Sequence, residues 1–164
     1  MSDVIEVLFV CMGNICRSPT AHGVMRHLVA TRGLAHRVRV DSAATHDYHP
    51  GEPPDRRTVA HARRRGYDLS DLRARQVGRD DFARAHHVLV MDAANERAVA
   101  ALCPPEHLPK VRRLTAHLRR LDHDHVPDPY YGGPEGFEVV LDLCEDACAG
   151  LLEALVAEGR AAEA

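Results

Sequence analysis

Residues 4–19 read Val-Ile-Glu-Val-Leu-Phe-Val-Cys-Met-Gly-Asn-Ile-Cys-Arg-Ser-Pro. The first part of this stretch, 4–10, is a short β-branched and aromatic run, which is typical of a buried strand. It ends at Cys11. Ser18 followed by Pro19 favours a helix start, because the hydroxyl can cap the first turn and the proline ring already has a helical φ. The stretch therefore predicts a strand, a tight loop and a helix in direct succession.

Strand-like and helix-like patterns alternate along the rest of the chain. We expect further strands at 38–40, 87–91 and 110–114, helices at 19–33, 53–66, 93–103 and 137–155, and a loop at 121–134. This alternation predicts an α/β fold, a single three-layer domain with a central, mostly parallel four-stranded sheet flanked by helices on both faces. Ligands of such sheets bind beyond the carboxyl ends of the strands, which is where Cys11 lies.

Length and composition exclude several classes of protein. The chain has 164 residues, 45% apolar and 27% charged, which fits one domain over residues 1–164 with a frayed, alanine-rich end at 159–164. Lys+Arg 21 against Asp+Glu 24 gives a net charge of −3, so no basic excess indicates a nucleic-acid partner. No stretch approaches the ~20 apolar residues of a membrane span, and no signal-peptide pattern opens the sequence. We therefore expect a cytoplasmic protein without a membrane partner, whose five cysteines form no disulfide framework.

The pattern Cys-x5-Arg-Ser joins the first strand to the first helix, with Cys11 and Arg17 at its ends. A loop that curls into a helix N-terminus directs several backbone N–H groups at one point, where the helix dipole favours negative charge. A cysteine at that point should be a thiolate, and an arginine offers a planar fork that matches two phosphate oxygens. Gly13 and Asn14 tolerate the unusual φ values of such a loop, and Ser18 can donate a hydrogen bond to the thiolate as it leaves. The pattern predicts a nucleophile in an oxyanion cradle, as covalent phosphoryl transfer requires.

Two other interpretations of this segment are weaker. A nucleotide-binding phosphate loop would need Gly-Lys-Ser/Thr, but the single lysine of the chain is Lys110. A zinc site would be built from Cys11, Cys16, His22 and His27. Its spacing differs from that of a zinc finger, and it leaves Arg17 unexplained. The histidine pairs elsewhere are better explained as scattered surface or core residues.

Hydrolysis of a phosphate ester also needs an acid for the leaving oxygen. Asp128 is the candidate, in the stretch 126–133, Val-Pro-Asp-Pro-Tyr-Tyr-Gly-Gly, although an ordinary Asp-Pro turn explains the local sequence at least as well. Tyr130 and Tyr131 lie in a chain with four tyrosines, three phenylalanines and no tryptophan. Two adjacent tyrosines in a polar loop favour contact with a substrate over burial in the core.

These motifs and their order resemble the low-molecular-weight protein tyrosine phosphatases along nearly the whole chain. The matching stretches are 10–19, Val-Cys-Met-Gly-Asn-Ile-Cys-Arg-Ser-Pro; 41–45, Asp-Ser-Ala-Ala-Thr; 51–55, Gly-Glu-Pro-Pro-Asp; 73–76, Arg-Ala-Arg-Gln; 90–92, Val-Met-Asp, with Asn95; and 128–130, Asp-Pro-Tyr. The resemblance implies one phosphatase domain over residues 1–164 that hydrolyses phosphotyrosine and small aryl phosphates. It implies neither a metal nor an organic cofactor.

The resemblance also implies a role for each site residue. Cys11 would attack phosphorus and form a cysteinyl-phosphate, and Asp128 would protonate the leaving phenolate and then take a proton from the attacking water. The equatorial phosphate oxygens would be bound by Arg17 and by the loop residues Met12, Gly13, Asn14, Ile15 and Cys16. The geometry of the loop would be supported by Asn14, Ser18, Ser42 and Asp92. The slot for the phosphotyrosine ring would be lined by Tyr48, Tyr130 and Tyr131.

Regulation and partners follow from the same resemblance. Cys16 would be the redox partner that forms a reversible disulfide with Cys11 under oxidation. The partners would be tyrosine-phosphorylated proteins, with inorganic phosphate as product and inhibitor. The chain departs from the family where relatives read Ser-Ala-Gly-Thr, because Ala44 stands in the third place and His46 and Asp47 follow. Because of this departure, the resemblance does not fix the conformation of the loop near Tyr48 or the substrate specificity that depends on it.

Two alternative functions remain. A thiol-dependent arsenate reductase of the same fold would share the nucleophile and the loop but needs two further redox cysteines, and the region 81–89 holds none. Cys144 and Cys148 lie four apart on the apolar stripe of the last helix, where burial is the better explanation, and Cys103 is unassigned. The other alternative, a non-catalytic phosphotyrosine- or zinc-binding module, would not need both a nucleophile and an acid.

Overall fold

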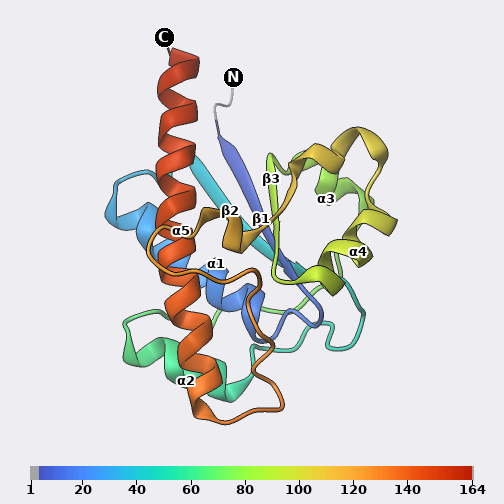
Figure 1. The fold of residues 1–164 in the computed structure, drawn as a ribbon, viewed down its shortest axis with the longest axis vertical. Coiled ribbons are helices and arrows are strands. Elements are labelled where there is room, and N and C mark those ends of the chain that lie inside the picture. The colour runs from blue at the N-terminus through green and yellow to red at the C-terminus, as the bar shows by residue number, and fades with distance from the viewer. Residues whose placement is uncertain (1–3, 164) are drawn as a thin grey trace.

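A four-stranded parallel sheet forms the centre of the protein (Figure 1). The computed structural model describes residues 4–163, with side chains as far as residue 159. The sheet has the order β2-β1-β3-β4 and consists of β1 (Ile5–Cys11), β2 (Val38–Ala44), β3 (His87–Val90) and β4 (Val111–Arg113). Every strand pair in it is parallel. This confirms the α/β fold with a parallel four-stranded sheet.

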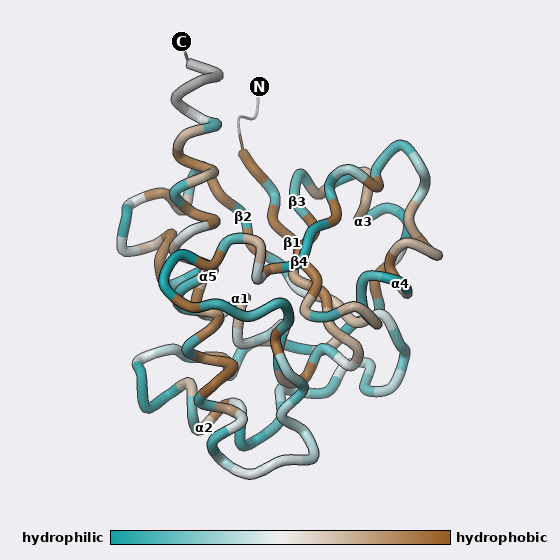
Figure 2. The backbone as a smooth tube through the Cα atoms, viewed as in Figure 1, coloured by the Kyte–Doolittle hydropathy of each residue, from teal (hydrophilic) through white to brown (hydrophobic). Residues whose placement is uncertain are grey.

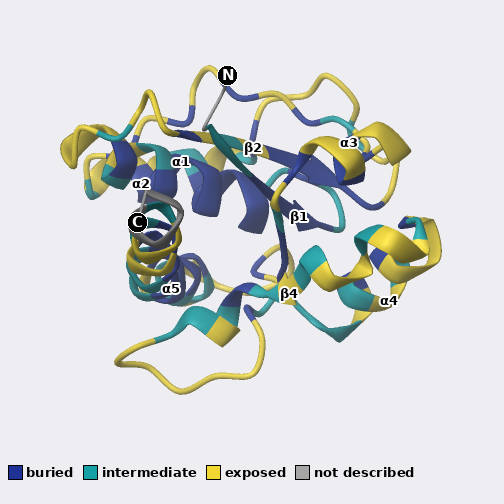
Figure 3. Cartoon of the chain, turned by 90° about the horizontal axis from the view of Figure 1, so that it is seen from above, coloured by how far each residue is buried: buried dark blue, intermediate teal, exposed yellow. Residues whose placement is uncertain are grey.

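Helices cover both faces of the sheet, as the alternation predicted (Figure 3). One face carries α1 (Arg17–Thr31), α2 (Arg56–Arg64) and α5 (Pro134–Glu163), and the other carries α3 (Arg79–Arg84) and α4 (Ala93–Leu102). Two short 3₁₀ helices, η1 (Pro105–Lys110) and η2 (Leu114–His117), flank β4. The described helices include none that is both long enough and apolar enough to cross a membrane.

The alternation of side chains along β1 decides which core each residue joins. Val7, Phe9 and Cys11 belong to the core beneath α1 and α5, whereas Leu8 and Val10 belong to the core beneath α3 and α4. Successive side chains of a strand point to opposite faces, so a residue at the end of β1 is assigned to one face by its position alone. Cys11 therefore lies on the same face of the sheet as α1, the next helix in the chain.

The long helix α5 packs its apolar stripe into the larger core, and polar and apolar segments alternate along it in Figure 2. Cys144, Cys148, Leu151 and Leu155 are at most 2% exposed, which confirms the predicted stripe. The helix begins at Pro134 rather than near residue 137, since proline suits the first helical position. We expected fraying at 159–164; α5 is helical as far as its end at residue 163, and residue 164 lies outside the described residues.

Three local expectations differ from the structure. The N-cap of α1 is Cys16, without a side-chain cap, so that Ser18 lies inside the first turn and its hydroxyl is used elsewhere. β2 extends to Ala44 because residues 41–44 pair with β1. Helix α3 was not expected, because six residues are too short to show a helical period.

Gly150 gives a test of how tightly α5 is packed. A Cβ at this position would overlap the backbone oxygen of His117, which cannot move as the tip of a side chain does. We expect Gly150→Ala to lower the free energy of unfolding by about 1–3 kcal/mol, as overpacking does. Urea unfolding measures the loss. Gly159→Ala is the matched control on the same helix, because a Cβ at Gly159 meets open space and alanine favours a helix; an equal loss in both variants would contradict the packing argument.

Candidate active site at the end of β1

The segment between β1 and α1 curls around the sulfur of Cys11. Cys11 is the last residue of β1 and is 3% exposed, and Cys16 caps α1. Asn14 has a φ of 57°, a left-handed conformation that asparagine adopts more readily than most residues. The turn between the strand and the helix thus holds the predicted phosphate-binding residues Met12, Gly13, Asn14, Ile15 and Cys16. We call residues 12–16 the phosphate loop.

The sulfur of Cys11 lies within reach of two hydrogen-bond donors from Ser18. The Ser18 hydroxyl is 3.1 Å from the sulfur, and the Ser18 backbone N–H donates to it at 3.4 Å. Asn14 Nδ2 donates to the same hydroxyl oxygen at 2.7 Å. Because the serine oxygen already accepts from an amide, its own hydrogen is left to donate to the sulfur. Ser18 is therefore placed where the sequence predicted, although it does not cap the helix.

Asn14 also fixes the loop to a neighbouring segment. Its Oδ1 accepts the backbone N–H of Arg75 at 3.2 Å, and the Arg75 side chain forms ion pairs with Asp41 at 2.8 Å and Asp81 at 2.9 Å. Arg75 thus connects the loop to β2 and α3, a role that the sequence analysis did not assign. The motif Arg-Ala-Arg-Gln at 73–76 marked this segment in the sequence, but no local pattern showed that its backbone contacts Asn14.

Ser42 supports the site by a different route from the one expected. Its hydroxyl lies 2.9 Å from Nδ1 of His22, a residue of α1 that is 7% exposed. Burial is the main cause that lowers the pKa of His22, to about 4, and the positive charge of Arg26 adds to it. Ser42 therefore supports a neutral histidine on α1, rather than the loop itself.

Arg17 is buried, with 2% of its side chain exposed. Its Nη1 donates to Asp92 Oδ2 at 2.6 Å and to the carbonyl oxygen of Val126 at 3.1 Å, while its Nη2 lies 3.8 Å from Asp128 Oδ2. Burial disfavours the cation, but the negative charges of Cys11 and Asp92 outweigh it and raise the pKa of Arg17. A cationic fork is thus held between the nucleophile candidate and the acid candidate.

Asp92 performs two tasks at the end of β3. Its Oδ1 accepts the N–H of Asn95 at 2.8 Å and caps α4, and its Oδ2 binds Arg17. Burial acts against the charge, but these two hydrogen bonds hold the pKa of Asp92 below its usual range. The cap fixes the carboxylate, and the carboxylate orients the guanidinium.

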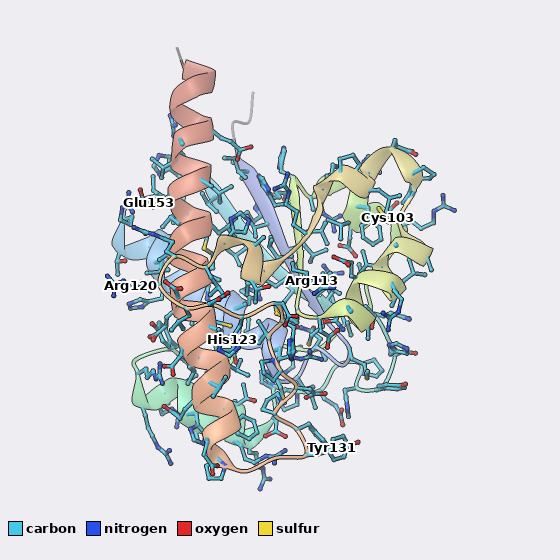
Figure 4. All side chains as sticks on the ribbon, viewed as in Figure 1. Cys103, Arg113, Arg120, His123, Tyr131 and Glu153 are labelled. Atoms are coloured by element: carbon cyan, nitrogen blue, oxygen red, sulfur yellow. The ribbon has the colours of Figure 1, made fainter. Side chains whose placement is uncertain are left out.

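Asp128 lies in the loop before α5, partly open to solvent. Its side chain is 41% exposed, and its Oδ1 accepts the backbone N–H of Tyr130 at 3.1 Å. Tyr130 is 38% exposed and Tyr131 is 93% exposed, with their rings in an edge contact 4.9 Å apart. Figure 4 shows Tyr131 projecting from the lower end of the molecule. The structure therefore brings Arg17 and Asp128 together, with exposed aromatic rings beside the acid.

Tyr48 lies between two histidines, His46 and His49, whose rings both contact its own. Its ring is 60% exposed and stacks on His46, with centroids 5.0 Å apart. The backbone N–H of His46 donates to the oxygen of Met12 at 3.0 Å. The unusual His46 thus both touches the loop and supports the tyrosine that was expected to contact substrate.

His49, which the sequence indicated only as one of the scattered histidines, is a neighbour of the phosphate loop. A Cβ added to Gly13 would lie 3.2 Å from Cδ2 of His49, so the imidazole rests against the loop. Glu52 holds the other side of the ring, 2.5 Å from Nδ1. The presence of histidines after residue 45 was the only local signal for this contact.

The cysteines other than Cys11 are buried in different places. Burial raises the pKa of the Cys16 thiol to about 12. Burial also raises the pKa values of Cys144 and Cys148, both 0% exposed within α5. Cys103 lies in the core beneath α3 and α4, on that side of the molecule in Figure 4. The predicted burial of the α5 pair is confirmed.

The side chains of the alternative zinc set do not converge. His22 is paired with Ser42, and His27 makes an edge contact with the ring of Tyr67 at 5.2 Å. Over the part of the chain that the structure describes, no three histidine, cysteine or acidic side chains are placed to hold a metal ion. The donor set that was considered from spacing is therefore not assembled.

Protonation of His22 should destabilise the protein in mildly acidic solution. The unfolded chain takes up a proton near the ordinary histidine value of 6.5, whereas folded His22 does so only near 4, so that stability is lost as the pH falls between these values. We expect His22→Gln, which keeps a hydrogen-bonding partner for Ser42, to lose less stability than the parent between pH 7.5 and 5. Urea unfolding at both pH values checks this, with exposed His36→Gln as control; parallel losses in all three proteins would contradict it.

Comparison with known proteins identifies the family. The sequence model of the family described as "Low molecular weight phosphotyrosine protein phosphatase" matches residues 6–161. A low molecular weight protein-tyrosine-phosphatase of Streptomyces coelicolor is 47% identical over 163 residues, which cover 96% of this chain and 98% of that protein. The human low molecular weight phosphotyrosine protein phosphatase is 39% identical over 154 residues, covering 90% of this chain and 94% of that protein.

Solved structures agree with the sequence relatives. A protein tyrosine phosphatase from Entamoeba histolytica, crystallised with Hepes in the active site, superposes with a TM-score of 0.91 at 37% identity and covers 95% of this chain and 99% of that chain. YfkJ from Bacillus subtilis gives a TM-score of 0.89 at 36% identity, covering 94% of this chain and 96% of that chain. The chain belongs to the low molecular weight phosphotyrosine protein phosphatase family, and it is a hydrolase.

Proposed function

We propose that residues 1–164 form a single catalytic domain that hydrolyses phosphotyrosine in proteins, and small aryl phosphates, through a cysteinyl-phosphate intermediate. One observation carries the proposal. Cys11 is the last residue of β1, and its sulfur lies within hydrogen-bond reach of both donors of Ser18 on the first turn of α1. Arg17, in the same turn, is buried. A nucleophile, a helix N-terminus and a guanidinium at one point can stabilise the charge of a transferring phosphoryl group.

In the first step, the Cys11 thiolate attacks phosphorus in line with the phenolic oxygen. The backbone N–H groups of the loop and the fork of Arg17 bind the equatorial oxygens, over which the negative charge of the transferring group is spread in the transition state. Asp128, protonated in this step, donates its proton to the leaving phenolate. The products of the step are a free tyrosine side chain and a phosphate bound to Cys11.

In the second step, water attacks the cysteinyl-phosphate. Asp128, now ionised, takes a proton from this water, and the sulfur leaves as a thiolate. Ser18 donates a hydrogen bond to that sulfur, which makes the departure easier. Inorganic phosphate is then the product and, because it fits the same cradle, an inhibitor. The steps need only side chains and water.

The substrate slot is formed by the exposed rings. The exposed rings of Tyr48, Tyr130 and Tyr131 offer flat apolar faces to a phenyl ring, whose stacking favours phosphotyrosine over the shorter phosphoserine. His46 and His49 stand next to the loop, where most of the local departure from the family pattern lies. Their imidazole rings are therefore groups that can contact a substrate bound near the phosphate.

We also propose that Cys16 protects the nucleophile in a cytoplasmic, reducing environment. A peroxide would oxidise Cys11 to a sulfenic acid, and the sulfur of Cys16 would then displace water to form a disulfide that thiols reduce. Cys16 caps the same turn that Cys11 opens, which supports the pairing. The arsenate reductase alternative is disfavoured because the region 81–89, where such enzymes would carry further redox cysteines, holds none.

Replacement of the nucleophile tests the proposal most directly. We expect Cys11→Ser to abolish hydrolysis of p-nitrophenyl phosphate, because a serine hydroxyl is not ionised at neutral pH, while inorganic phosphate still binds. Absorbance assays measure turnover and calorimetry measures binding. Cys103→Ser, in the other core, is the control and should stay active. Retained turnover in Cys11→Ser would disprove the mechanism.

The acid role of Asp128 is tested by comparing leaving groups. We expect Asp128→Ala to reduce kcat/KM for phenyl phosphate by about 100-fold or more, the usual contribution of general acid catalysis, and to reduce it far less for p-nitrophenyl phosphate, whose phenolate leaves without a proton. Asp124→Ala, an exposed residue of the same loop that pairs with His125, is the matched control. Equal losses on the two substrates would refute the assignment.

A further inference from the structure

The loop that carries Asp128 is attached to the rest of the molecule near both of its ends. We call residues 126–133 the acid loop. At its start, the N–H of Val126 donates to the oxygen of Met91 at 2.7 Å, and the oxygen of Val126 accepts from Arg17 at 3.1 Å. Further along, the oxygen of Tyr130 accepts from Nη2 of Arg57 at 3.0 Å. Asp128 lies midway between these two attachments.

The bond from Arg57 ties the middle of the acid loop to α2, in addition to the ion pair of Asp128 with Arg17 at 3.8 Å. The backbone of 127–133 forms one internal hydrogen bond, from Gly132 N–H to the oxygen of Pro129 at 3.1 Å, and the oxygen of Gly133 accepts the N–H of Gly136 in α5 at 3.1 Å. Among the hydrogen bonds of the described residues, only the one from Arg57 connects 127–133 to α1, α2 or the sheet. An exposed loop with few such contacts depends on each of them for its position.

Arg57 itself is held rigidly. Its Nε and Nη2 bind the two carboxylate oxygens of Asp55 at 3.1 and 3.0 Å. Its guanidinium carbon lies 5.4 Å from the ring centre of Tyr130 and 4.8 Å from that of Phe137. A planar fork with a bidentate anion and two aromatic faces has few orientations open to it. The remaining hydrogen of Nη2 is therefore directed at the Tyr130 oxygen.

The same contacts connect the acid loop to the phosphate loop. The backbone N–H of Asp55 donates to the oxygen of Ile15 at 2.9 Å, and Ile15 belongs to the turn around Cys11. On the other side, the N–H of Tyr130 donates to Asp128 Oδ1 at 3.1 Å. A continuous path thus runs from Ile15 through Asp55, Arg57 and Tyr130 to the carboxylate of Asp128.

We propose that Arg57 is a positioning residue for Asp128: by fixing Tyr130 relative to the phosphate loop, it holds the acid where it can protonate the leaving oxygen. The inference rests on the proposed function, since it needs Asp128 to be the general acid. Arg57 touches neither Cys11 nor Arg17 in the described contacts, so it acts through Tyr130 and not on the phosphoryl group. A displacement of an acid by about 1 Å is enough to cost up to about 100-fold in rate.

The experiment is a double-mutant cycle on two substrates. We expect Arg57→Met, which keeps an unbranched apolar stem beside the rings, to lower kcat/KM for phenyl phosphate about tenfold or more and to change that for p-nitrophenyl phosphate by less than about threefold, within the range that misplacement of a catalytic group produces. Arg57→Lys should show most of the same loss, because an ammonium cannot form the fork. The inhibition constant of inorganic phosphate should stay the same in both variants, because the phosphate loop is intact.

Two comparisons make the cycle decisive. Arg56→Met is the matched control, an exposed arginine of the same helix turn, and it should leave both substrates unaffected. In an Asp128→Ala background, Arg57→Met should cause no further loss, because the group that it positions is gone.

The outcomes separate this inference from the proposed function. Equal losses on both substrates, a weakened binding of phosphate, or a loss that persists in the Asp128→Ala background would overturn the positioning role of Arg57 alone. If Asp128→Ala shows no dependence on the leaving group, the acid role fails and the inference fails with it. Both proposals are supported if Arg57→Met lowers kcat/KM for phenyl phosphate alone and causes no further loss when it is added to Asp128→Ala.

Discussion

A buried guanidinium must be surrounded by acceptors, and much of the structure around Cys11 meets this requirement for Arg17. Its side chain is 2% exposed, and an unpaired charge at that depth would cost several kcal/mol. Asp92 from the end of β3 and the oxygen of Val126 satisfy it, with Asp128 nearby. The need to pair one cation thus joins three segments that are far apart in the sequence, and it leaves the rest of the fork for an anion.

The same constraint explains why the carboxyl ends of two strands carry the site. β1 ends at Cys11, and Asp92 follows the neighbouring β3 and caps α4. In a parallel sheet these ends meet at one edge, and each is followed by a helix whose N-terminus faces the same region. The sulfur is held by the first turn of α1 and the carboxylate by the first turn of α4. Charge at this edge is therefore stabilised by backbone dipoles before any substrate arrives.

Arginines also connect the loops of the site to this edge of the sheet and to the helices around it. Arg17 binds the start of the acid loop, Arg57 binds its middle, and Arg75 binds the phosphate loop to β2 and α3. Each has a carboxylate partner that fixes its fork, since Asp92, Asp55 and Asp81 serve the three in turn. Paired in this way, Arg17 and Arg57 direct a remaining N–H at one backbone oxygen, whereas Arg75 contacts Asn14 through its backbone N–H.

The sequence by itself determined the order of the main elements and the parallel sheet, and it placed Cys11 and Arg17 at the junction of a strand and a helix. Local patterns were sufficient for this, because a strand, a loop and a helix that follow one another over 4–19 need no distant contact to be recognised. The position of Cys11 on the face of α1 follows from the period of β1 alone. The sequence did not predict the short helix α3 or the 3₁₀ helices, because segments of a few residues carry no clear period.

Only the tertiary structure decided which side chains meet. Ser18 was expected both to cap the helix and to donate to the sulfur; it lies within reach of the sulfur but does not cap the helix, because α1 begins at Arg17, two residues before the expected start at 19. Ser42 pairs with His22, 20 residues before it, and Arg57 reaches Tyr130, 73 residues after it. A sequence names the donors and acceptors, but the pairs among them are set by packing of helices on the sheet, which brings distant segments within about 3 Å. The residue types of the site are thus a property of the sequence, and their partners are a property of the fold.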